Sequence, residues 1–323
     1  MLAIQATRTG GPEVIEVVDL PVPTPGPGEI LIRHEAIGLN FIDTYYRSGL
    51  YPARLPGVLG VEGAGVVEAV GEGVTRFKTG DRAGYAGGPL GAYAEFRTYK
   101  ADRAVPLPPG VSSETAAAAL LKGMTAEFLL RRCYPVKSGQ TVLVHAAAGG
   151  VGQILVQWAR HLGCRVIGTA GDAAKADIAR ALGCEDVILY REEDVAARVR
   201  ALTGGEGVPV VYDGVGAATF EGSLSSLARR GMLVSYGNAS GPAPAVLPSR
   251  LAQDGSLFLT RPGLFDYIAT RDELDESAGA LFEVLAAGAV KVEIGQTFPL
   301  AEARAAHEAL EGRGTTGSTL LIP

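Results

Sequence analysis

The chain has 323 residues, 47% of them hydrophobic and 20% charged, which is enough to bury a large core in two domains and is not typical of a disordered protein. Its net charge of −6 and the lack of any run of Lys or Arg disfavour nucleic acid as a partner, because sequence-independent binding needs a basic surface. The sequence has no apolar run of roughly 18 residues and opens without a secretory signal, so we expect a cytoplasmic protein without a membrane contact.

The first 120 residues have the pattern of a mostly β domain. Corners rich in Gly and Pro, such as PVPTPGPGE and LPPG, separate short alternating runs such as ILIRHEAIGL and GAGVVEAVGEGV. The segment GVTRFKTGDRA predicts a turn that leads into another strand.

Between about residues 140 and 260, short β-branched runs alternate with helical patterns. Six runs predict strands: TVLVH, RVIGT, DVILY, VPVVYD, GMLVSYG and GSLFLT. After TVLVH, apolar residues at 151, 154, 155, 158 and 162 line one face of a helix that Gly163 ends. Further helices are predicted over residues 175–182, 192–202 and 219–227. This alternation predicts an α/β fold with a Rossmann-type, doubly wound parallel sheet of six strands.

The tail contains one amphipathic helix, AEARAAHEALEG, and a closing strand, STLLIP. A single strand needs a partner, and the N-terminal β domain is the natural one. We therefore expect one domain over residues 1–122 and 263–323, and a second domain over residues 123–262 inserted into it.

A glycine-rich motif follows the first strand of the expected parallel sheet. Compared with the dinucleotide fingerprint G-x-G-x-x-G, the sequence has Ala147-x-Gly149-x-x-Gly152, with Ala in place of the first glycine. Alone this is a weak signal, equally consistent with close packing of a helix on a strand. Because the motif leaves a strand and opens an amphipathic helix, we expect both roles: Gly149 and Gly150 let an anion approach the helix start, and Gly152 lets helix and strand touch.

The tip of the second strand indicates which dinucleotide binds. An Asp or Glu there would bind the ribose 2′-hydroxyl of NAD, whereas this strand ends Gly168-Thr169-Ala170-Gly171. The missing carboxylate permits a 2′-phosphate, which the ammonium of Lys175 and the hydroxyl of Tyr190 could reach. A solvated lysine and an ordinary strand-end tyrosine are the alternative. Asp172 lies beyond the tip and is expected to cap the next helix.

The chain resembles the medium-chain dehydrogenase/reductase superfamily, and within it the zinc-free, zeta-crystallin-like quinone oxidoreductases. The resemblance covers essentially the whole length. It is carried by GGPEV (10–14), AIGLNFIDTYYRSGLYP (36–52), GVEGAGVVEAVGEGV (60–74), GDRAGY (80–85), LKGMTA (121–126), HAAAGGVG (145–152) and TRPGL (260–264). It implies a GroES-like catalytic domain, a Rossmann domain and NADPH in the cleft between them.

Zinc-dependent relatives provide a contrast. They place a zinc-binding Cys where this chain has Asn40 and a zinc-binding His where it has Val61, and the cysteine-rich structural-zinc lobe is missing. Four histidines and three cysteines remain, none paired at ligand spacing: His34, His145, His161, His307, Cys133, Cys164 and Cys184. We therefore expect no bound metal, and cysteines that are free thiols in a reducing cytosol.

The resemblance implies that Asn40, Tyr45 and Tyr51 line the active site near the nicotinamide. All three can donate hydrogen bonds to an oxygen that gains charge when a carbonyl is reduced, although simple packing of a strand end and a loop is the alternative. Phe128 stands where relatives have a tyrosine beside the nicotinamide, which puts a proton-donor role there in doubt. Asn40 is also one of only two asparagines in the chain.

Contacts to the cofactor are expected from a larger set that the motifs and the resemblance define together. Arg313 is the residue of this set for which a rim salt bridge is an equal alternative to assisting Lys175. The set is Asn40, Lys122, Thr125, Ala148, Gly149, Gly150, Val151, Gly171, Lys175, Tyr190, Asn238, Arg261 and Arg313.

The function that we expect is NADPH-dependent reduction of quinones without zinc, by a homodimer, with hydride and single-electron transfer both open. An enzymatic alternative is reduction of α,β-unsaturated carbonyls or enoyl thioesters. An alternative of another class is a non-catalytic NADPH-binding protein with a structural or RNA-binding role, against which the acidic balance counts. Scarce asparagine and methionine fit a thermophile, although a GC-rich genome would also favour Arg, Ala and Gly.

Overall fold

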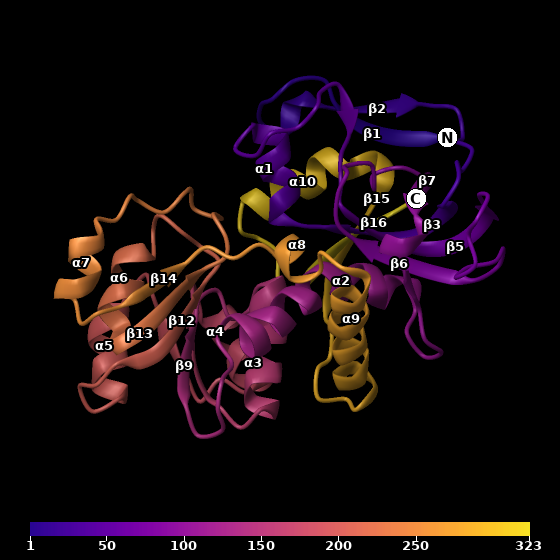
Figure 1. Cartoon of the computed structure of the whole chain (residues 1–323). Helices are drawn as coiled ribbons and strands as arrows, with labels where there is room; N and C mark the ends of the chain where they lie inside the picture. The colour runs from indigo at the N-terminus through magenta and orange to yellow at the C-terminus, as the bar shows by residue number, and fades with distance from the viewer. The chain divides into compact units, whose positions relative to one another are not determined.

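The computed structural model describes all 323 residues, and the chain divides into two compact units (Figure 1). Unit 1 consists of Met1–Met124, Ile268–Ala286 and Val292–Pro323, and unit 2 of Thr125–Tyr267 and Ala287–Lys291. No helix of either unit has the length and apolar character that crossing a membrane requires.

Unit 1 is built on two β-sheets, with helices at their margins. Its strands are β1 (Leu2–Ala6), β2 (Ile15–Asp19), β3 (Glu29–Leu39), β4 (Gly57–Val58), β5 (Glu62–Val70), β6 (Arg82–Ala86), β7 (Phe96–Lys100), β8 (Val105–Pro106), β15 (Ile294–Pro299) and β16 (Ser318–Ile322). Its helices are α1 (Phe41–Ser48), the first part of α2 (Ser113–Phe128), α9 (Arg271–Ala286) and α10 (Ala303–Glu311), with 3-10 turns at Pro12–Val14, Ala101–Arg103 and Leu300–Glu302.

The larger sheet of unit 1 pairs the last strand of the chain with a strand from its first forty residues. Its order is β15-β16-β3-β5-β6-β8, with β7 also paired to β3, and a smaller sheet has the order β2-β1-β4. The tail strand β16 runs antiparallel to β3, with Leu321 opposite Ile37. The last strand of the chain is thus hydrogen-bonded to a strand of the N-terminal region. Apolar side chains of both sheets and of α10 form one core, including Ile4, Ile32, Leu59, Tyr93, Ala306 and Leu321.

Unit 2 contains the predicted parallel sheet. Its strands are β9 (Thr141–Val144), β10 (Arg165–Ala170), β11 (Asp186–Leu189), β12 (Val208–Asp213), β13 (Leu227–Ser235) and β14 (Phe258–Thr260). Its helices are the end of α2, the π-helical turn Leu129–Cys133, α3 (Gly150–His161), α4 (Ala173–Leu182), α5 (Val195–Leu202), α6 (Phe220–Ser226), α7 (Pro248–Gln253) and α8 (Leu264–Tyr267).

The six strands of unit 2 are all parallel and have the order β11-β10-β9-β12-β13-β14. This is the doubly wound order in which the chain reverses direction across the sheet between β9 and β12. Helix α3 contacts α4, and α5 contacts α6, as expected when the two pairs cover opposite faces (Figure 1). The predicted fold class is confirmed, and the carboxyl ends of β9, β10 and β12 meet at one edge.

Two helix predictions need correction. Helix α1 was not predicted, although Asn40 and Asp43 are spaced as a capping box: the Asn40 N–H donates to Asp43 Oδ2 over 2.9 Å. The helix expected from residue 192 begins instead at Val195, because the Asp194 carboxylate accepts the Ala197 N–H and caps it there. Asp172 caps α4 as predicted, through the Lys175 N–H at 2.9 Å.

Candidate active site and nucleotide-binding loop

The glycine-rich loop of unit 2 lies where β9 passes into α3. The first hydrogen bond of the helix type runs from the Gln153 N–H to the Gly149 carbonyl, at 2.8 Å. The amides of Gly150, Val151 and Gly152 precede it and have no acceptor within the helix. A Cβ on Gly152 would lie 2.2 Å from the Ala146 carbonyl oxygen, so only glycine fits. The loop therefore combines close packing with free amides at a positive helix end, which suits a pyrophosphate.

The tips of β10 and β11 form the second part of this surface. A Cβ on Gly171 would lie 2.8 Å from the Tyr190 hydroxyl, which places Tyr190 directly against the tip of β10. Lys175 lies in the first turn of α4, and Asp172 is occupied as its cap. The Arg191 guanidinium lies 6.0 Å from the centre of the Tyr190 ring. Arg191 was not predicted, although its position directly after Tyr190 is a signal that could have identified it. Lys175 at the start of α4 and Arg191 after β11 are therefore the cations of this region, and Glu193, which accepts the Leu189 N–H, is an acid beside them.

Asn238 and Arg261 lie together at the ends of β13 and β14. With its amide oriented to satisfy both groups, Asn238 donates to the Gly237 carbonyl over 3.0 Å and accepts from Arg261 over 3.2 Å. Arg261 also donates to the Ser235 carbonyl, at 2.9 Å. A Cβ on Gly237 would lie 2.2 Å from the Gly214 carbonyl oxygen, so the ends of β12 and β13 approach each other closely.

In unit 1, Asn40 lies between β3 and α1 as the N-cap residue of the helix, and it is buried. Its amide nitrogen donates to Glu62 Oε2 over 2.8 Å and to the Gly38 carbonyl over 3.3 Å. Glu62 is fully buried and also accepts the Leu121 N–H at 2.6 Å, and its carboxylate lies 3.5 Å from the Lys122 ammonium. A substrate oxygen would thus compete with Glu62 and Gly38 for the Asn40 hydrogens.

Burial raises the pKa of the Glu62 carboxyl, and this effect outweighs Lys122 and the hydrogen bonds from Asn40 and Leu121, which lower it. Gly38 makes the contact sterically feasible, because a Cβ there would lie 2.3 Å from Glu62 Oε2. Glu62 was not predicted as part of the site. It brings Asn40 and Lys122, two predicted site residues, to one carboxylate.

Three tyrosines cluster at the other end of α1. The rings of Tyr45 and Tyr51 meet edge to face with their centres 5.3 Å apart, and the rings of Tyr46 and Tyr51 do so at 5.8 Å. The Tyr51 N–H donates to the Tyr45 carbonyl over 3.0 Å. Tyr45 and Tyr51, predicted from the resemblance, are therefore neighbours, and Tyr46 joins them. Burial raises the pKa of the Tyr46 hydroxyl, and the nearby Asp43 carboxylate adds to this.

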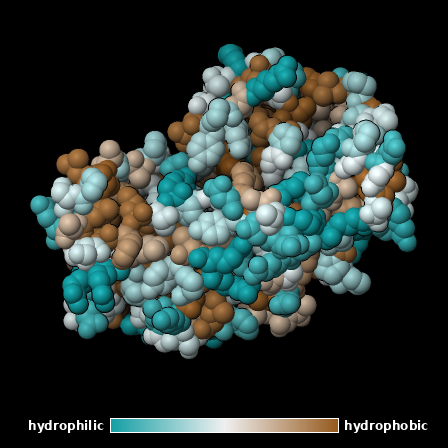
Figure 2. Space-filling model, viewed as in Figure 1, coloured by the Kyte–Doolittle hydropathy of each residue, from teal (hydrophilic) through white to brown (hydrophobic).

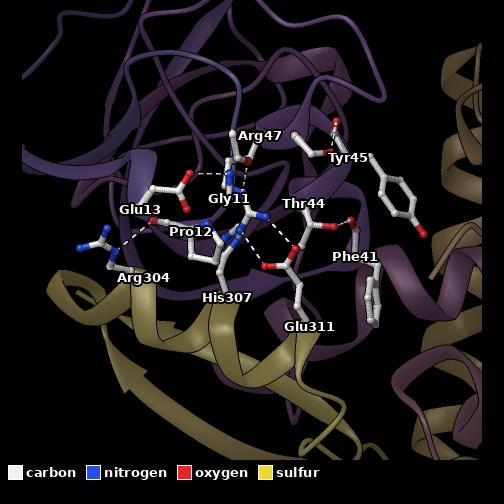
Figure 3. Close-up of polar contacts among 12 residues, drawn as sticks. Gly11, Pro12, Glu13, Phe41, Thr44, Tyr45, Arg47, Arg304, His307 and Glu311 are labelled. Carbon is white, nitrogen blue, oxygen red and sulfur yellow. Dashed lines mark hydrogen bonds and ion pairs between the residues drawn. The ribbon is translucent and has the colours of Figure 1, made fainter. Parts of the chain in front are cut away.

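Arg47 fastens α1 to α10 (Figure 3). Its guanidinium donates to both oxygens of Glu311, at 2.9 and 2.7 Å, and to His307 Nδ1 at 3.0 Å. His307 Nε2 lies 3.1 Å from the Tyr93 hydroxyl, which donates to Asp43 Oδ2 over 3.0 Å. This chain of contacts returns to the start of α1. Tyr45 points away from the Arg47 cluster, so the anchored and the aromatic faces of α1 are separate (Figure 3).

Three further residues that the sequence analysis considered lie outside the groups described above. Phe128 is buried in unit 2 and stacks on Tyr267, with ring centres 4.3 Å apart. Thr125 is buried near the end of α2. Arg313 follows α10 in unit 1 and has a left-handed backbone, with φ of 58°.

The predicted site residues therefore fall into two groups. Unit 1 holds Asn40, Tyr45, Tyr51, Lys122 and Arg313. Unit 2 holds Thr125, Ala148, Gly149, Gly150, Val151, Gly171, Lys175, Tyr190, Asn238 and Arg261.

The residues present do not fit a metal ion. No three His, Cys, Asp or Glu side chains gather in a group that could bind one. At the two positions singled out from the sequence, the Asn40 amide is bonded to Glu62 and Val61 is fully buried.

Comparison with known proteins places the chain in a family. Residues 26–109 match the alcohol dehydrogenase GroES-like domain, and residues 150–268 match the zinc-binding dehydrogenase family. A quinone oxidoreductase from Pseudomonas aeruginosa is 53% identical over 99% of both chains. A 2-haloacrylate reductase from a Burkholderia species is 45% identical over 100% of this chain and 99% of its own.

A solved structure supports the same relationship. The Escherichia coli quinone oxidoreductase complexed with NADPH superposes with a TM-score of 0.98, at 50% identity, over 100% of both chains. Identity of this level over the full length is far above what a shared fold alone produces. The chain therefore belongs to the quinone oxidoreductases of the medium-chain dehydrogenase/reductase superfamily.

Proposed function

We propose that the protein is an enzyme that reduces quinones with NADPH as the electron donor. One observation carries this proposal: a quinone oxidoreductase solved with NADPH matches the whole chain at 50% identity. The glycine-rich start of α3 and the position of Lys175 in the first turn of α4 support it, because both suit a phosphorylated dinucleotide.

NADPH supplies the reducing equivalents when bound, and the chain binds and orients it. In the proposal, the amides of Gly150 and Val151 receive the pyrophosphate, with Ala148 and Gly149 shaping the approach. The Lys175 ammonium and the Tyr190 hydroxyl receive the 2′-phosphate, beside Gly171. The remaining proposed cofactor contacts come from Asn40, Lys122, Thr125, Asn238, Arg261 and Arg313.

The quinone is proposed to bind against Tyr45 and Tyr51. Their edge-to-face rings bring apolar ring carbons and two hydroxyls together, which suits an aromatic acceptor bearing oxygens. Asn40 and Tyr45 are the proposed donors to the oxygen that gains negative charge. Domain 1–122 with 263–323 would carry these groups, and domain 123–262 the nucleotide site.

The proposed chemistry does not use a metal. Purified enzyme treated with a chelator should retain full activity, because no side-chain group of the chain is arranged to hold a metal. Elemental analysis of the same sample is the companion measurement. Activity that is lost with the chelator and restored by zinc would contradict the proposal.

Reduction of an α,β-unsaturated carbonyl compound is a second candidate, favoured by the 45% identity to a 2-haloacrylate reductase. Steady-state rates with a panel of quinones, enones, 2-chloroacrylate and crotonyl thioester, each with NADPH and NADH, distinguish the two. The proposal expects the highest kcat/KM for quinones with NADPH. A preference for 2-chloroacrylate or enones would favour the second function, and no turnover on the panel would favour a non-catalytic role.

We also propose a homodimer formed through β14, the edge strand of unit 2. Leu247 is 73% exposed and Phe258 56% exposed, and β14 pairs only with β13. An exposed apolar sheet edge promotes association, and a second copy would cover it. Figure 2 shows apolar side chains gathered over the region of α7 and β14.

Light scattering should give twice the chain mass, and Phe258→Lys should give a monomer. A monomeric parent protein would exclude the dimer.

Two smaller proposals concern the cellular compartment of the protein and its adaptation to heat. Cys133, Cys164 and Cys184 are free thiols in the structure, which supports a reducing cytoplasm. The two asparagines of the chain support heat adaptation, for which calorimetry should give a Tm well above about 65 °C. A Tm in the mesophilic range would leave genome composition as the reason.

A further inference from the structure

A chain of buried polar side chains lies beneath the nucleotide-binding loop of unit 2. Asp213 Oδ2 accepts from the Ser223 hydroxyl at 2.7 Å, and that hydroxyl lies 3.0 Å from His145 Nε2. His145 Nδ1 lies 3.1 Å from the Thr169 hydroxyl, which accepts the Ala146 N–H at 3.2 Å. All four side chains are at most 1% exposed, so water does not compete for these contacts. None of the four belongs to the proposed cofactor contacts.

The hydrogen bonds of this series of side chains all run in one direction, from the Ala146 N–H and the Thr169 hydroxyl on one side to the Asp213 carboxylate on the other. Asp213 is held as an acceptor: its Oδ1 also receives the N–H groups of Val215 and Gly216, at 2.8 and 3.0 Å. The Ser223 hydroxyl therefore donates its hydrogen to Asp213 and can only accept from His145. His145 must then carry its hydrogen on Nε2.

The same reasoning continues on the other side of the ring. With its hydrogen on Nε2, the neutral ring presents a lone pair at Nδ1, which accepts the Thr169 hydroxyl hydrogen. The Thr169 oxygen is then free to accept the Ala146 N–H. Burial lowers the pKa of His145, which favours the neutral ring, although the Asp213 charge opposes this effect. Each donor is used once, and the series ends on a carboxylate, so its members reinforce one another.

The last member of this series, Ala146, is the residue that needs support. Its φ is 51°, in the left-handed region that non-glycine residues rarely adopt. Its carbonyl accepts the Gly149 N–H at 2.9 Å and packs against Gly152 at the start of α3. Ala146 thus fixes the turn from which the amides of Gly150 and Val151 project.

We propose that His145 is a positioning residue, which as a neutral Nε2–H imidazole links Asp213 to the Ala146 amide and so holds the nucleotide-binding loop ready for the pyrophosphate of NADPH. The inference rests on the proposed function for its ligand. The arrangement of the side chains can be tested without any ligand.

The tautomer is the first measurement. In ligand-free protein labelled with ¹⁵N-histidine, long-range ¹H–¹⁵N NMR distinguishes Nε2–H from Nδ1–H rings. His145 should be the Nε2–H form. His34 is an internal reference of the opposite kind, because its Nδ1 must donate to the Ala94 carbonyl at 2.6 Å while Tyr85 faces its Nε2. A His145 ring with its hydrogen on Nδ1, or doubly protonated at neutral pH, would overturn the proposal.

The second measurement is NADPH binding by Thr169→Val, which removes the hydroxyl that bonds Ala146. Its Kd for NADPH should rise about tenfold and KM for NADPH should follow, with kcat at saturating NADPH kept. Thr169→Ser retains the hydroxyl and should restore parent affinity. Tyr212→Phe is the matched control, since it removes a buried hydroxyl bonded to the Leu129 carbonyl in the same unit and keeps the backbone carbonyl that accepts the His145 N–H. Its Kd should equal that of the parent.

The outcomes separate the inference from the proposed function. If the parent protein does not bind NADPH, the proposed function and the inference both fail. If the parent binds NADPH and Thr169→Val binds it equally well, only the inference fails. Should Thr169→Val not fold, Ser223→Ala breaks the series on the other side of His145, two members further from the loop, and an unchanged Kd in that variant overturns the proposal.

Discussion

At the scale of single residues, Lys175 provides a direct test of cofactor choice. A charge-assisted hydrogen bond is worth about 1.5–3 kcal/mol, so Lys175→Ala should raise the Kd for NADPH about ten- to a hundredfold. NADH lacks the 2′-phosphate, and its Kd should barely change. Arg180→Ala is a control on the same helix, because Arg180 is exposed and pairs with Asp177 at 2.8 Å. Equal losses for NADPH and NADH, measured by fluorescence titration, would indicate an effect on folding.

Tyr45 tests the proposed donor to the quinone. Tyr45→Phe keeps the ring against Tyr51 and removes the hydroxyl. A preorganised donor can be worth about 3 kcal/mol, but quinones accept electrons readily, so we expect kcat/KM to fall about five- to fiftyfold. The Kd for NADPH should stay near the parent value. Tyr46→Phe, on the same helix and in contact with Tyr51, is the control. If Tyr45→Phe reduces quinones as fast as the parent enzyme, the Tyr45 hydroxyl is not a donor, and the tyrosines contribute only the shape of the binding surface.

Asn40 has a structural role that the sequence did not predict, because its amide is a hydrogen-bond donor to the buried Glu62 carboxylate. Removing its amide in Asn40→Ala leaves Glu62 buried with one donor fewer, which should lower the free energy of unfolding by about 1–3 kcal/mol. Glu62→Gln makes the partner neutral, so the same substitution should cost less in that background. Urea unfolding of the four proteins of this cycle gives the coupling. Strict additivity would show that the Asn40–Glu62 contact contributes nothing.

The parts of the site that were predictable are local in sequence. The spacing of Gly149 and Gly152 after a strand, and the absence of an acid at Gly171, are visible within a few residues. Asn40 and Glu62 lie 22 residues apart, and His145 and Ser223 lie 78 apart. Their contacts depend on the register of β3 with β5 and on where α6 packs, and no short motif encodes these.

At the scale of elements, the contact between α1 and α10 should govern the stability of unit 1. Arg47 is 1% exposed and bonds to Glu311, His307 and the Gly10 carbonyl. Arg47→Met should lower the free energy of unfolding by about 3 kcal/mol, because it breaks a largely buried ion pair. Arg304→Ala on α10 removes a half-exposed contact to the Pro12 carbonyl and should cost less than about 0.5 kcal/mol. Similar losses in both variants, measured in urea, would contradict the anchoring role.

Whole elements were easier to predict than the helix that carries the site. The six strands of unit 2 follow from repeated β-branched runs, and the pairing of the tail strand follows from the need of a lone strand for a partner. Helix α1 was missed because FIDTYYRS is short and flanked by strand-like residues, so its periodicity is weak. The sequence signal for the start of this helix is the three-residue spacing of Asn40 and Asp43, which is that of a capping box.

At the scale of the whole molecule, two buried groups should shape the pH dependence of stability in opposite directions. Burial lowers the pKa of His307 to about 3, with Arg47 adding to this effect. Between pH 3 and 6.5, His307 is therefore protonated in the unfolded chain and neutral in the folded chain. Its contribution to stability is complete above the unfolded pKa of 6.5 and declines as the pH falls towards 3. Burial raises the pKa of Asp43 to about 7, so its folded form keeps a proton that the unfolded chain loses above 3.8. Stability from Asp43 therefore declines as the pH rises from 3.8 through 7.

The measurement is the slope of unfolding free energy between about pH 4 and pH 6. One proton corresponds to about 1.4 kcal/mol per pH unit, so His307→Gln should lower the slope by about that amount. Asp43→Asn should raise it by a similar amount, because the opposing group is gone. Unchanged slopes in both variants would mean that neither group keeps its folded protonation state over this range.

The pairing of Ile37 with Leu321 has a consequence for synthesis on the ribosome. Residues 29–33 of β3 pair early with β7, but residues 37–39 have no partner on that margin until β16 has been made, roughly 15–60 s later at ordinary elongation rates. The strands of unit 2 are contiguous in sequence and can assemble as soon as they emerge. Until then, residues 37–39 of the nascent unit 1 expose unpaired backbone groups, and we expect this unit to aggregate more readily than unit 2 when translation stalls.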